Sequence, residues 1–142
     1  MATHIIFDLN RTLYDPETDE LVTGAREILD SAARRGIVLA LISRREPGRE
    51  GILARFGIAH YFVRTDYVSE KTPECFMSLL HVLTAPPEHV LVVGDHPDDI
   101  RCGNACGAMT VRFRKGRFRD LDEGGVRPVH EIDSLEKLER YF

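Results

Sequence analysis

The chain has 142 residues and a formal net charge of −4 at pH 7, and 43% of its residues are hydrophobic. This length predicts one domain, residues 1–142, with enough apolar side chains for a sizeable core. The net charge gives no overall reason to expect a nucleic acid or an anionic membrane as a partner. No apolar run approaches the ~20 residues of a membrane span, and the three cysteines lack paired spacing. We therefore expect a cytoplasmic protein with no membrane partner.

Short apolar runs alternate with segments of helical periodicity along the chain. The runs predicted as strands are His4–Phe7, Ile37–Ile42, Tyr61–Val63, His89–Val93 and Met109–Phe113. The first, second and fourth are continuously apolar, which is typical of parallel strands covered on both faces. The last run alternates apolar and polar residues, which predicts an edge strand.

Helical segments lie between these strands, and capping residues mark their ends. The boundary residues are Thr23 and Gly36 for the first helix, Gly57 for the end of the second, Thr72 and Pro73 for the start of the third, Pro97 and Gly107 for the fourth, and Ser134 for the start of a last short helix. Strands and helices thus alternate from one end to the other. The order predicts an α/β fold, a three-layer Rossmann-like sandwich with a central parallel five-stranded sheet.

Polar side chains follow the carboxyl ends of these strands, where open α/β sheets bind their ligands. Asp8 ends the first strand and Asp95 follows the fourth, while Ser43 and Lys71 come after the second and third. If their strands are neighbours, Asp8 and Asp95 lie within reach of one cation. Mg²⁺ prefers such carboxylate oxygens, a carboxylate is a competent nucleophile, and Ser and Lys can hold phosphoryl oxygens. This set of residue types indicates phosphoryl transfer.

The same residues resemble a known family. Motifs I to IV of the haloacid dehalogenase (HAD) superfamily are similar in order and spacing to Asp8–Leu13, Ser43, Lys71–Glu74 and Gly94–Ile100. The resemblance covers roughly residues 4–113, and four motifs on successive strands are specific although each alone is common. It implies a HAD-like core with the Asp8 strand at the centre, the Asp95 strand beside it and Met109–Phe113 at the edge.

The resemblance also implies a metal centre and a nucleophile. Asp8 is expected to be the nucleophile and a Mg²⁺ ligand, with the main-chain oxygen of Asn10 and the carboxylate of Asp95 as further ligands. Asp99 is expected to support the metal's waters or to pair with Lys71. The implied cofactor is Mg²⁺.

A phosphate site follows from the same resemblance. Ser43 and Lys71 are expected to hold the transferring phosphoryl group, and Arg44 is expected to contact the substrate because it follows Ser43 directly. The implied function is a Mg²⁺-dependent phosphohydrolase, a phosphomonoesterase that acts on a phosphorylated substrate through an aspartyl-phosphate on Asp8.

Asn10 departs from the family pattern, because the family's phosphatases carry an acid two residues after the nucleophile. An amide neither donates nor takes up the proton, and the loss of a general acid–base group costs ~10²–10⁴-fold in rate. Three interpretations stay open: a family member with weak hydrolysis or another reaction, a catalytically impaired phosphate-binding, metal-binding or protein-interaction module, and a substitution introduced to trap a complex. Dehalogenation is less favoured, since the superfamily's dehalogenases need no metal.

The places where family members insert a cap domain are short in this chain. From Thr12 to Gly24 there is room for a tight turn and a small hairpin, and from Ser43 to Lys71 for one helix and one strand. We therefore expect no cap domain and an open site, which suits a bulky or macromolecular phosphate ester or a homo-oligomer that closes the site. The basic and aromatic residues 112–119 fit nucleic acid, but a solvated edge strand and loop is the preferred interpretation.

Overall fold

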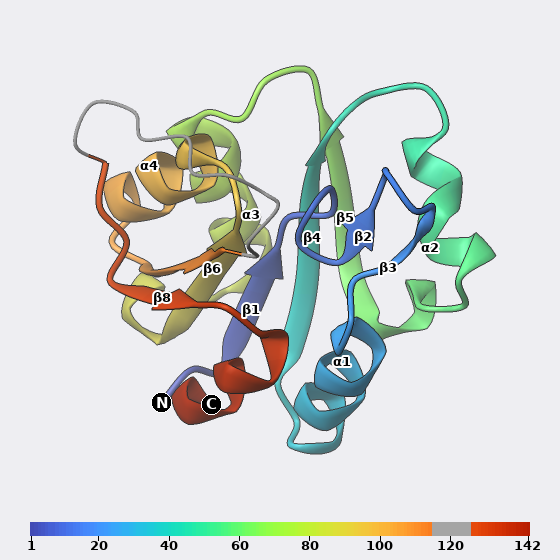
Figure 1. Cartoon of the computed structure of the whole chain (residues 1–142). Coiled ribbons are helices and arrows are strands. Elements are labelled where there is room, and N and C mark those ends of the chain that lie inside the picture. Colours follow the sequence, from blue (N-terminus) through green and yellow to red (C-terminus); the bar gives the residue numbers. More distant parts are fainter. Residues whose placement is uncertain (115–125) are drawn as a thin grey trace.

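The computed structural model describes residues 1–114 and 126–142. Within this part of the chain, six parallel strands form one sheet in the order β5-β4-β1-β6-β7-β8 (Figure 1). The strands are β1 His4–Phe7, β4 Val38–Arg44, β5 Phe62–Val68, β6 Val90–Gly94, β7 Met109–Phe113 and β8 His130–Ile132. The α/β fold is confirmed, with β1 at the centre and β6 beside it.

Helices cover both faces of this sheet (Figure 1). One face packs against α1 Ala25–Arg34, α2 Ile52–Arg55 and the 3₁₀ helix Leu135–Tyr141, and the other packs against α3 Pro73–Leu83 and α4 Pro97–Ala105. Shorter 3₁₀ helices are η1 Arg49–Gly51, η2 Ala59–Tyr61 and η3 Pro87–His89. The three layers agree with the sandwich that the alternating sequence predicts.

The apolar run of β1 serves two cores at once. Ile5 and Phe7 belong to the cluster of side chains that includes the buried residues of α1, whereas Ile6 belongs to the cluster that includes Phe76 of α3. Successive side chains of a strand point to opposite faces, so a strand covered on both faces needs an apolar residue at every position. That requirement explains why the central strands were evident in the sequence.

The prediction of five strands is wrong, because a sixth strand, β8, lies at one edge of the sheet. β8 pairs in parallel with β7, so Met109–Phe113 is an inner strand instead of an edge strand. Accordingly Arg112 is 3% exposed, which contradicts the solvated edge strand expected there. β8 has only three residues and no apolar run, so nothing in its composition marks it as a strand. Residues 115–119 of the basic segment lie outside the described residues.

The opposite edge strand is longer than predicted. β5 runs to Val68 instead of ending at Val63, and Val63, Arg64 and Thr65 are exposed. An edge strand with an exposed centre gains its hydrogen bonds from β4 alone, so its sequence needs no continuous apolar run. The apolar pattern therefore revealed the start of this strand and missed its end.

Two short insertions stand where the resemblance places a cap. A hairpin of β2 Tyr14–Asp15 and β3 Glu20–Leu21 occupies the chain between β1 and α1. The segment between β4 and β5 contains η1, α2 and η2. No cap domain is inserted at either place among the described residues. Among the same residues, no helix is both long and apolar enough to span a membrane.

Candidate active site

Two carboxylates come together at the carboxyl ends of β1 and β6. Asp8 directly follows β1, and its amide donates to the carbonyl of Val93 in β6 at 2.9 Å. Asp95 directly follows β6, and the parallel register pairs Phe7 with Val93. The two acids therefore lie at the same end of two neighbouring parallel strands, as the sequence predicts. Carboxylate oxygens of Asp8, Asp95 and Asp99 lie within 4.8 Å of one another.

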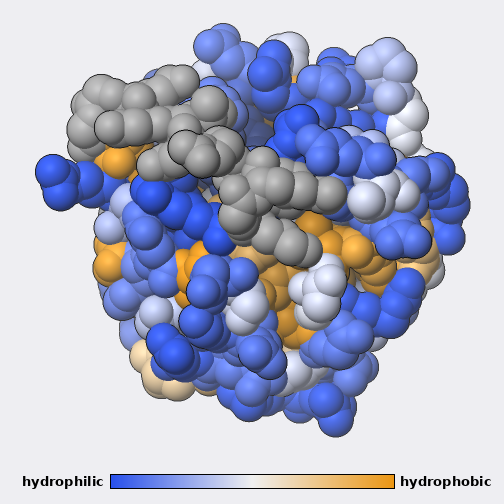
Figure 2. Space-filling model, in the orientation of Figure 1, coloured by the Kyte–Doolittle hydropathy of each residue, from blue (hydrophilic) through white to orange (hydrophobic). Residues whose placement is uncertain are grey.

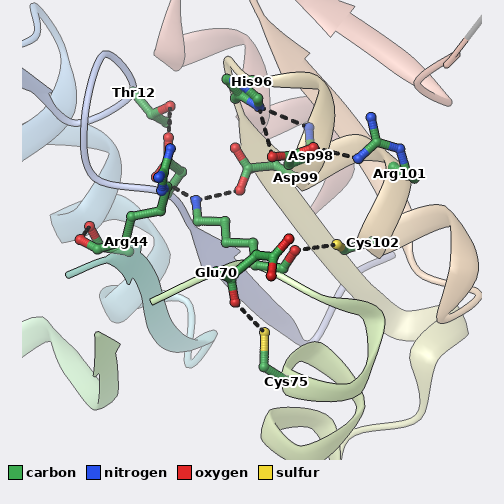
Figure 3. Close-up of polar contacts among 12 residues, drawn as sticks. Thr12, Arg44, Glu70, Cys75, His96, Asp98, Asp99, Arg101 and Cys102 are labelled. Atoms are coloured by element: carbon green, nitrogen blue, oxygen red, sulfur yellow. Dashed lines mark hydrogen bonds and ion pairs between the residues drawn. The ribbon is translucent and has the colours of Figure 1, made fainter. Parts of the chain in front are cut away.

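Asp99 reaches this cluster from the first turn of α4 (Figure 3). Its residue is 1% exposed, and a Cβ placed on Gly94 would lie 2.4 Å from its Oδ2 atom. Gly94 therefore leaves the space that Asp99 fills. The buried Oδ2 atom accepts no hydrogen bond from a described residue. Because buried polar atoms nearly always have a partner, this oxygen is suited to a metal ion or its waters.

Lys71 joins two of the acids. Its ammonium lies 2.7 Å from Asp8 Oδ1 and 2.6 Å from Asp99 Oδ1, and all three side chains are buried. Burial alone would lower the pKa of Lys71, but the charges of Asp8 and Asp99 outweigh it and raise that pKa. The lysine is therefore a permanent cation between two carboxylates.

One ammonium does not balance three carboxylates. Burial, and then the charge of Asp8, raise the pKa of Asp95 to about 8 and that of Asp99 to about 7. Without a further cation, the cluster takes up protons near neutral pH, since like charges and desolvation both disfavour ionisation. The donor set consists of hard carboxylate oxygens, and its excess negative charge fits a divalent cation such as Mg²⁺.

The start of α3 fixes the position of Lys71. The lysine stands one residue before the helix N-cap, Thr72, whose hydroxyl accepts from the amide of Cys75 at 3.3 Å. The buried thiol of Cys102 donates to the carbonyl of Lys71 at 3.6 Å. Burial raises the pKa of this thiol to about 12, so it stays protonated and keeps donating. Packing between α3 and α4 thus holds the lysine toward the acids.

A cavity of about 150 Å³ opens above the carboxylates. Its lining residues are Asp8, Asn10, Arg11, Arg44, Glu46, Arg49, Lys71, Asp95, His96 and Asp98. The predicted residues Asn10 and Arg44 are therefore at this site. Ser43 is buried at the end of β4, where its hydroxyl donates to the carbonyl of Arg44 at 3.1 Å, and it is absent from the cavity lining.

Some contributors were not predicted as site residues. Thr12 donates to Asp8 Oδ2 at 3.4 Å, and His96 caps α4 by accepting from the amide of Asp98 at 3.0 Å. Both stand inside quoted motifs, so their sequence position was a usable signal. Glu46 and Arg49 come from the loop and 3₁₀ helix after β4. Both follow Ser43 closely in the sequence, but composition alone does not show that the loop turns back to the cavity.

Comparison with known proteins agrees with this geometry. The family model for haloacid dehalogenase-like hydrolases matches residues 2–107. A glyceraldehyde 3-phosphate phosphatase of Methanopyrus kandleri is 36% identical over 95 residues, which are 61% of this chain and 40% of that protein. A dihydroxyacetone phosphatase of Corynebacterium glutamicum is 32% identical over 75 residues, 51% of this chain and 27% of that protein. The chain spans less than half the length of either relative.

Solved structures share the fold. A HAD-superfamily hydrolase of Geobacter sulfurreducens superposes with a TM-score of 0.80 at 14% identity, covering 100% of both chains. CbbY of Rhodobacter sphaeroides, solved in complex with phosphate, gives a TM-score of 0.79 at 16% identity over 97% of this chain and 96% of that one. At such low identities these structures establish the arrangement of the sheet and helices alone.

Proposed function

This chain belongs to the haloacid dehalogenase-like hydrolase family, and on that premise we propose that it is a Mg²⁺-dependent phosphomonoesterase acting through an aspartyl-phosphate on Asp8. The observation that carries this proposal is the convergence of three carboxylates within 4.8 Å, with the Lys71 ammonium between two of them. The similarity to phosphatases of M. kandleri and C. glutamicum supports a phosphorylated substrate.

The acidic residues fit the metal that such a reaction uses. Asp8, Asp95 and the main-chain oxygen of Asn10 would hold Mg²⁺, and Asp99 would hold its waters through the Oδ2 atom, which has no hydrogen-bond partner among the described residues. A bound Mg²⁺ would neutralise part of the charge on the phosphoryl oxygens. The ion would also relieve the repulsion that raises the pKa of Asp95 and Asp99.

The protein's own groups then carry the chemistry. A carboxylate oxygen of Asp8 attacks phosphorus, the ester P–O bond breaks, and its electron pair leaves on the alcohol oxygen, which takes up a proton. Water next attacks the phosphorus of the acyl phosphate and loses a proton, and inorganic phosphate leaves as the Asp8 carboxylate re-forms. Lys71 and Arg44 stabilise the phosphoryl oxygens, joined by Ser43 once its hydroxyl turns from the Arg44 carbonyl.

Asn10 is the reason to expect slow hydrolysis by this enzyme. Asn10 lines the cavity, but its side-chain amide cannot protonate the leaving oxygen or activate water. The proton must come from solvent, so esters with acidic leaving groups, such as aryl or acyl phosphates, are expected to react fastest. Equal rates for aryl and alkyl phosphates would contradict this assignment.

The decisive experiment measures phosphate release by the full chain and by Asn10→Asp, with Mg²⁺ and a panel of phosphate esters. Asn10→Asp is expected to raise turnover at least severalfold, because it restores the proton donor and acceptor. Asp8→Asn is the matched negative control, since it removes the nucleophile. An Asn10→Asp variant no faster than the parent would show that this residue does not limit the reaction.

Asn10 also favours a second candidate, a phosphate- and metal-binding module without turnover. Beryllium fluoride with Mg²⁺ would form an adduct with Asp8 in an intact phosphate pocket. A stable adduct in a chain that releases no phosphate, with or without Asn10→Asp, would support the binding module over the hydrolase.

The absence of an inserted cap among the described residues leaves the cavity open to large substrates. A bulky or macromolecular phosphate ester, or closure by a second subunit, is consistent with the short β2–β3 hairpin. Mass measurement in solution and turnover of a phosphopeptide against a free aryl phosphate would separate these cases.

A further inference from the structure

A second cleft, of about 550 Å³, adjoins the cavity above Asp8. The two share the lining residues Asn10, Arg11, Glu46 and Arg49. The second cleft continues along Tyr14, Pro16, Pro47, Gly48, Ile52 and Arg55. It therefore leads from the acidic cluster to the space between the β2–β3 hairpin and α2. A phosphoryl group held at Asp8 would place the rest of its ester in or near this cleft.

Cationic side chains outnumber anionic ones in the lining of this cleft. Among the cleft's lining residues, Arg11, Arg49 and Arg55 are cationic and Glu46 is anionic. Hydrophilic residues gather over the segment that joins β4 to α2 (Figure 2). Guanidinium groups bind carboxylate and phosphate oxygens through paired hydrogen bonds. The lining is therefore suited to an anion and unsuited to an apolar alcohol.

Arg49 is held in place before any ligand arrives. Its side chain is 13% exposed, with Nη2 at 3.0 Å from Glu46 Oε2 and Nη1 donating to the carbonyl of Arg44 at 3.2 Å. Glu46 is itself half exposed, so water weakens its hold on the charge of Arg49. The arginine stands where the two cavities meet and loses little side-chain entropy when it binds an anion.

Arg11 and Arg55 differ in whether their side chains already form an ion pair within the protein. Arg11 is exposed, has a φ of 61°, and forms no side-chain hydrogen bond or ion pair with another described residue. Arg55 pairs with Asp19 and lies 4.7 Å from the ring centroid of Phe56. Of the three arginines that line the cleft, Arg11 and Arg49 also line the cavity above Asp8, whereas Arg55 does not. The anion-binding charge next to that cavity therefore belongs to Arg11 and Arg49.

We infer that this cleft selects phosphomonoesters whose alcohol portion carries a second anionic group, a carboxylate or a phosphate, recognised by Arg11 and Arg49. The inference rests on the proposed hydrolase function, since it places the leaving group of that reaction. It assigns substrate choice to the loop after β1 and the segment after β4, instead of to a separate domain.

The test compares phosphate esters of three-carbon alcohols with and without a second anion. Turnover of 3-phosphoglycerate, glycerol 3-phosphate and propane-1,3-diol bisphosphate is measured with Mg²⁺ for the full chain and for its Asn10→Asp variant. Both doubly anionic esters are expected to exceed glycerol 3-phosphate in kcat/KM by at least about tenfold, the usual effect of a charge-assisted hydrogen bond. The better of the two identifies carboxylate or phosphate as the preferred group.

Arginine variants locate the effect. Arg11→Gln and Arg49→Gln are expected to raise KM more for the doubly anionic esters than for glycerol 3-phosphate, and so to reduce the preference between them. Arg34→Gln is the matched control, because Arg34 is an exposed cation of α1 that pairs with Asp30 and is absent from both linings. A loss of preference in the Arg34 variant would reveal a general charge effect and overturn the inference.

The two proposals fail in different ways. If all three esters are hydrolysed equally well, the hydrolase stands and the anion cleft is wrong. If no phosphate is released by the chain or by Asn10→Asp, the hydrolase fails, and dissociation constants for the three esters with Mg²⁺ replace the kinetic readout. Tighter binding of the doubly anionic esters that depends on Arg11 and Arg49 would then support the cleft, and equal binding would overturn it.

Discussion

The acidic centre and the arginine-lined cleft lie side by side but are built in opposite ways. In the centre, Asp8, Lys71 and Asp99 are at most 9% exposed, and each is fixed by a strand end or a helix start. In the cleft, Arg11 and Arg55 are exposed and come from a loop and a short helix. The rigid elements thus hold the groups proposed to react, and the loops hold those proposed to choose the substrate.

This difference sets the size of the expected mutational effects. Buried charges lose their hydration and depend on each other, so removing one leaves the others uncompensated. Exposed charges are screened by water and contribute little to stability, although they still attract a charged ligand. Mutations in the acidic centre should therefore mainly change stability, and mutations in the cleft should mainly change substrate preference.

The largest effect is expected at Lys71. Lys71→Met leaves Asp8 and Asp99 buried without their shared cation, which should lower the free energy of unfolding by about 3–5 kcal/mol. Urea unfolding without Mg²⁺ measures this loss, and adding Mg²⁺ should recover part of it. Lys137→Met removes an exposed pair with Asp133 and should unfold close to the parent. Similar losses in both variants would contradict the distinction between buried and exposed pairs.

A smaller effect is expected where the backbone approaches Asp99. Gly94→Ala would place a methyl group 2.4 Å from Asp99 Oδ2, so the carboxylate must move away from Lys71 and from the metal position. We expect a loss of about 1–3 kcal/mol in stability and weaker Mg²⁺ binding, measured by unfolding and calorimetric titration. Gly51→Ala is the matched control, since nothing lies within 4 Å of its added methyl group. Unchanged Mg²⁺ affinity in Gly94→Ala would show that Asp99 takes no part in binding the metal.

The sequence predicted the acidic centre better than the sheet edges for a physical reason. β1 and β6 are buried on both faces, so each is a continuous apolar run followed by an acid, Asp8 or Asp95. The short strand β8 owes its place to pairing with β7 and leaves no such pattern. The cleft was missed for a related reason, because Arg49 depends on the course of a loop and not on periodicity.

The protonation of the centre gives a third prediction. The pKa of Asp99 is raised to about 7 and that of Asp95 to about 8, so Mg²⁺ must displace protons at lower pH. Mg²⁺ affinity should therefore increase as the pH rises through these values, by up to about tenfold per pH unit for each proton displaced. Titration calorimetry in buffers of different ionisation enthalpy counts the released protons, and a pH-independent affinity would contradict the assignment.

The same pKa shifts determine whether the stability of the metal-free protein rises or falls with pH. Both carboxyl groups have a folded-state pKa above the unfolded value of about 4, so the folded chain binds more protons than the unfolded chain between these values. Their contribution to stability is fully present below the unfolded pKa and is lost as the pH rises through about 8. Thermal unfolding in a chelator should show this loss, and Mg²⁺ should remove it.

The smallest effect is expected at Arg55, which lies in the cleft with its charge already engaged. Arg55 pairs with Asp19, which also accepts a hydrogen bond from the hydroxyl of Tyr14 at 2.5 Å. Arg55 is half exposed and does not line the cavity above Asp8, whereas Arg49 is 13% exposed and lines both cavities. Arg55→Gln should therefore raise KM for 3-phosphoglycerate by less than about threefold, well below the effect of Arg49→Gln. Steady-state kinetics of the two variants, with aryl phosphate as the common reference, measures the difference. An equal rise in both would show that the cleft responds to its total charge, and that the fixed position of Arg49 gives it no special role.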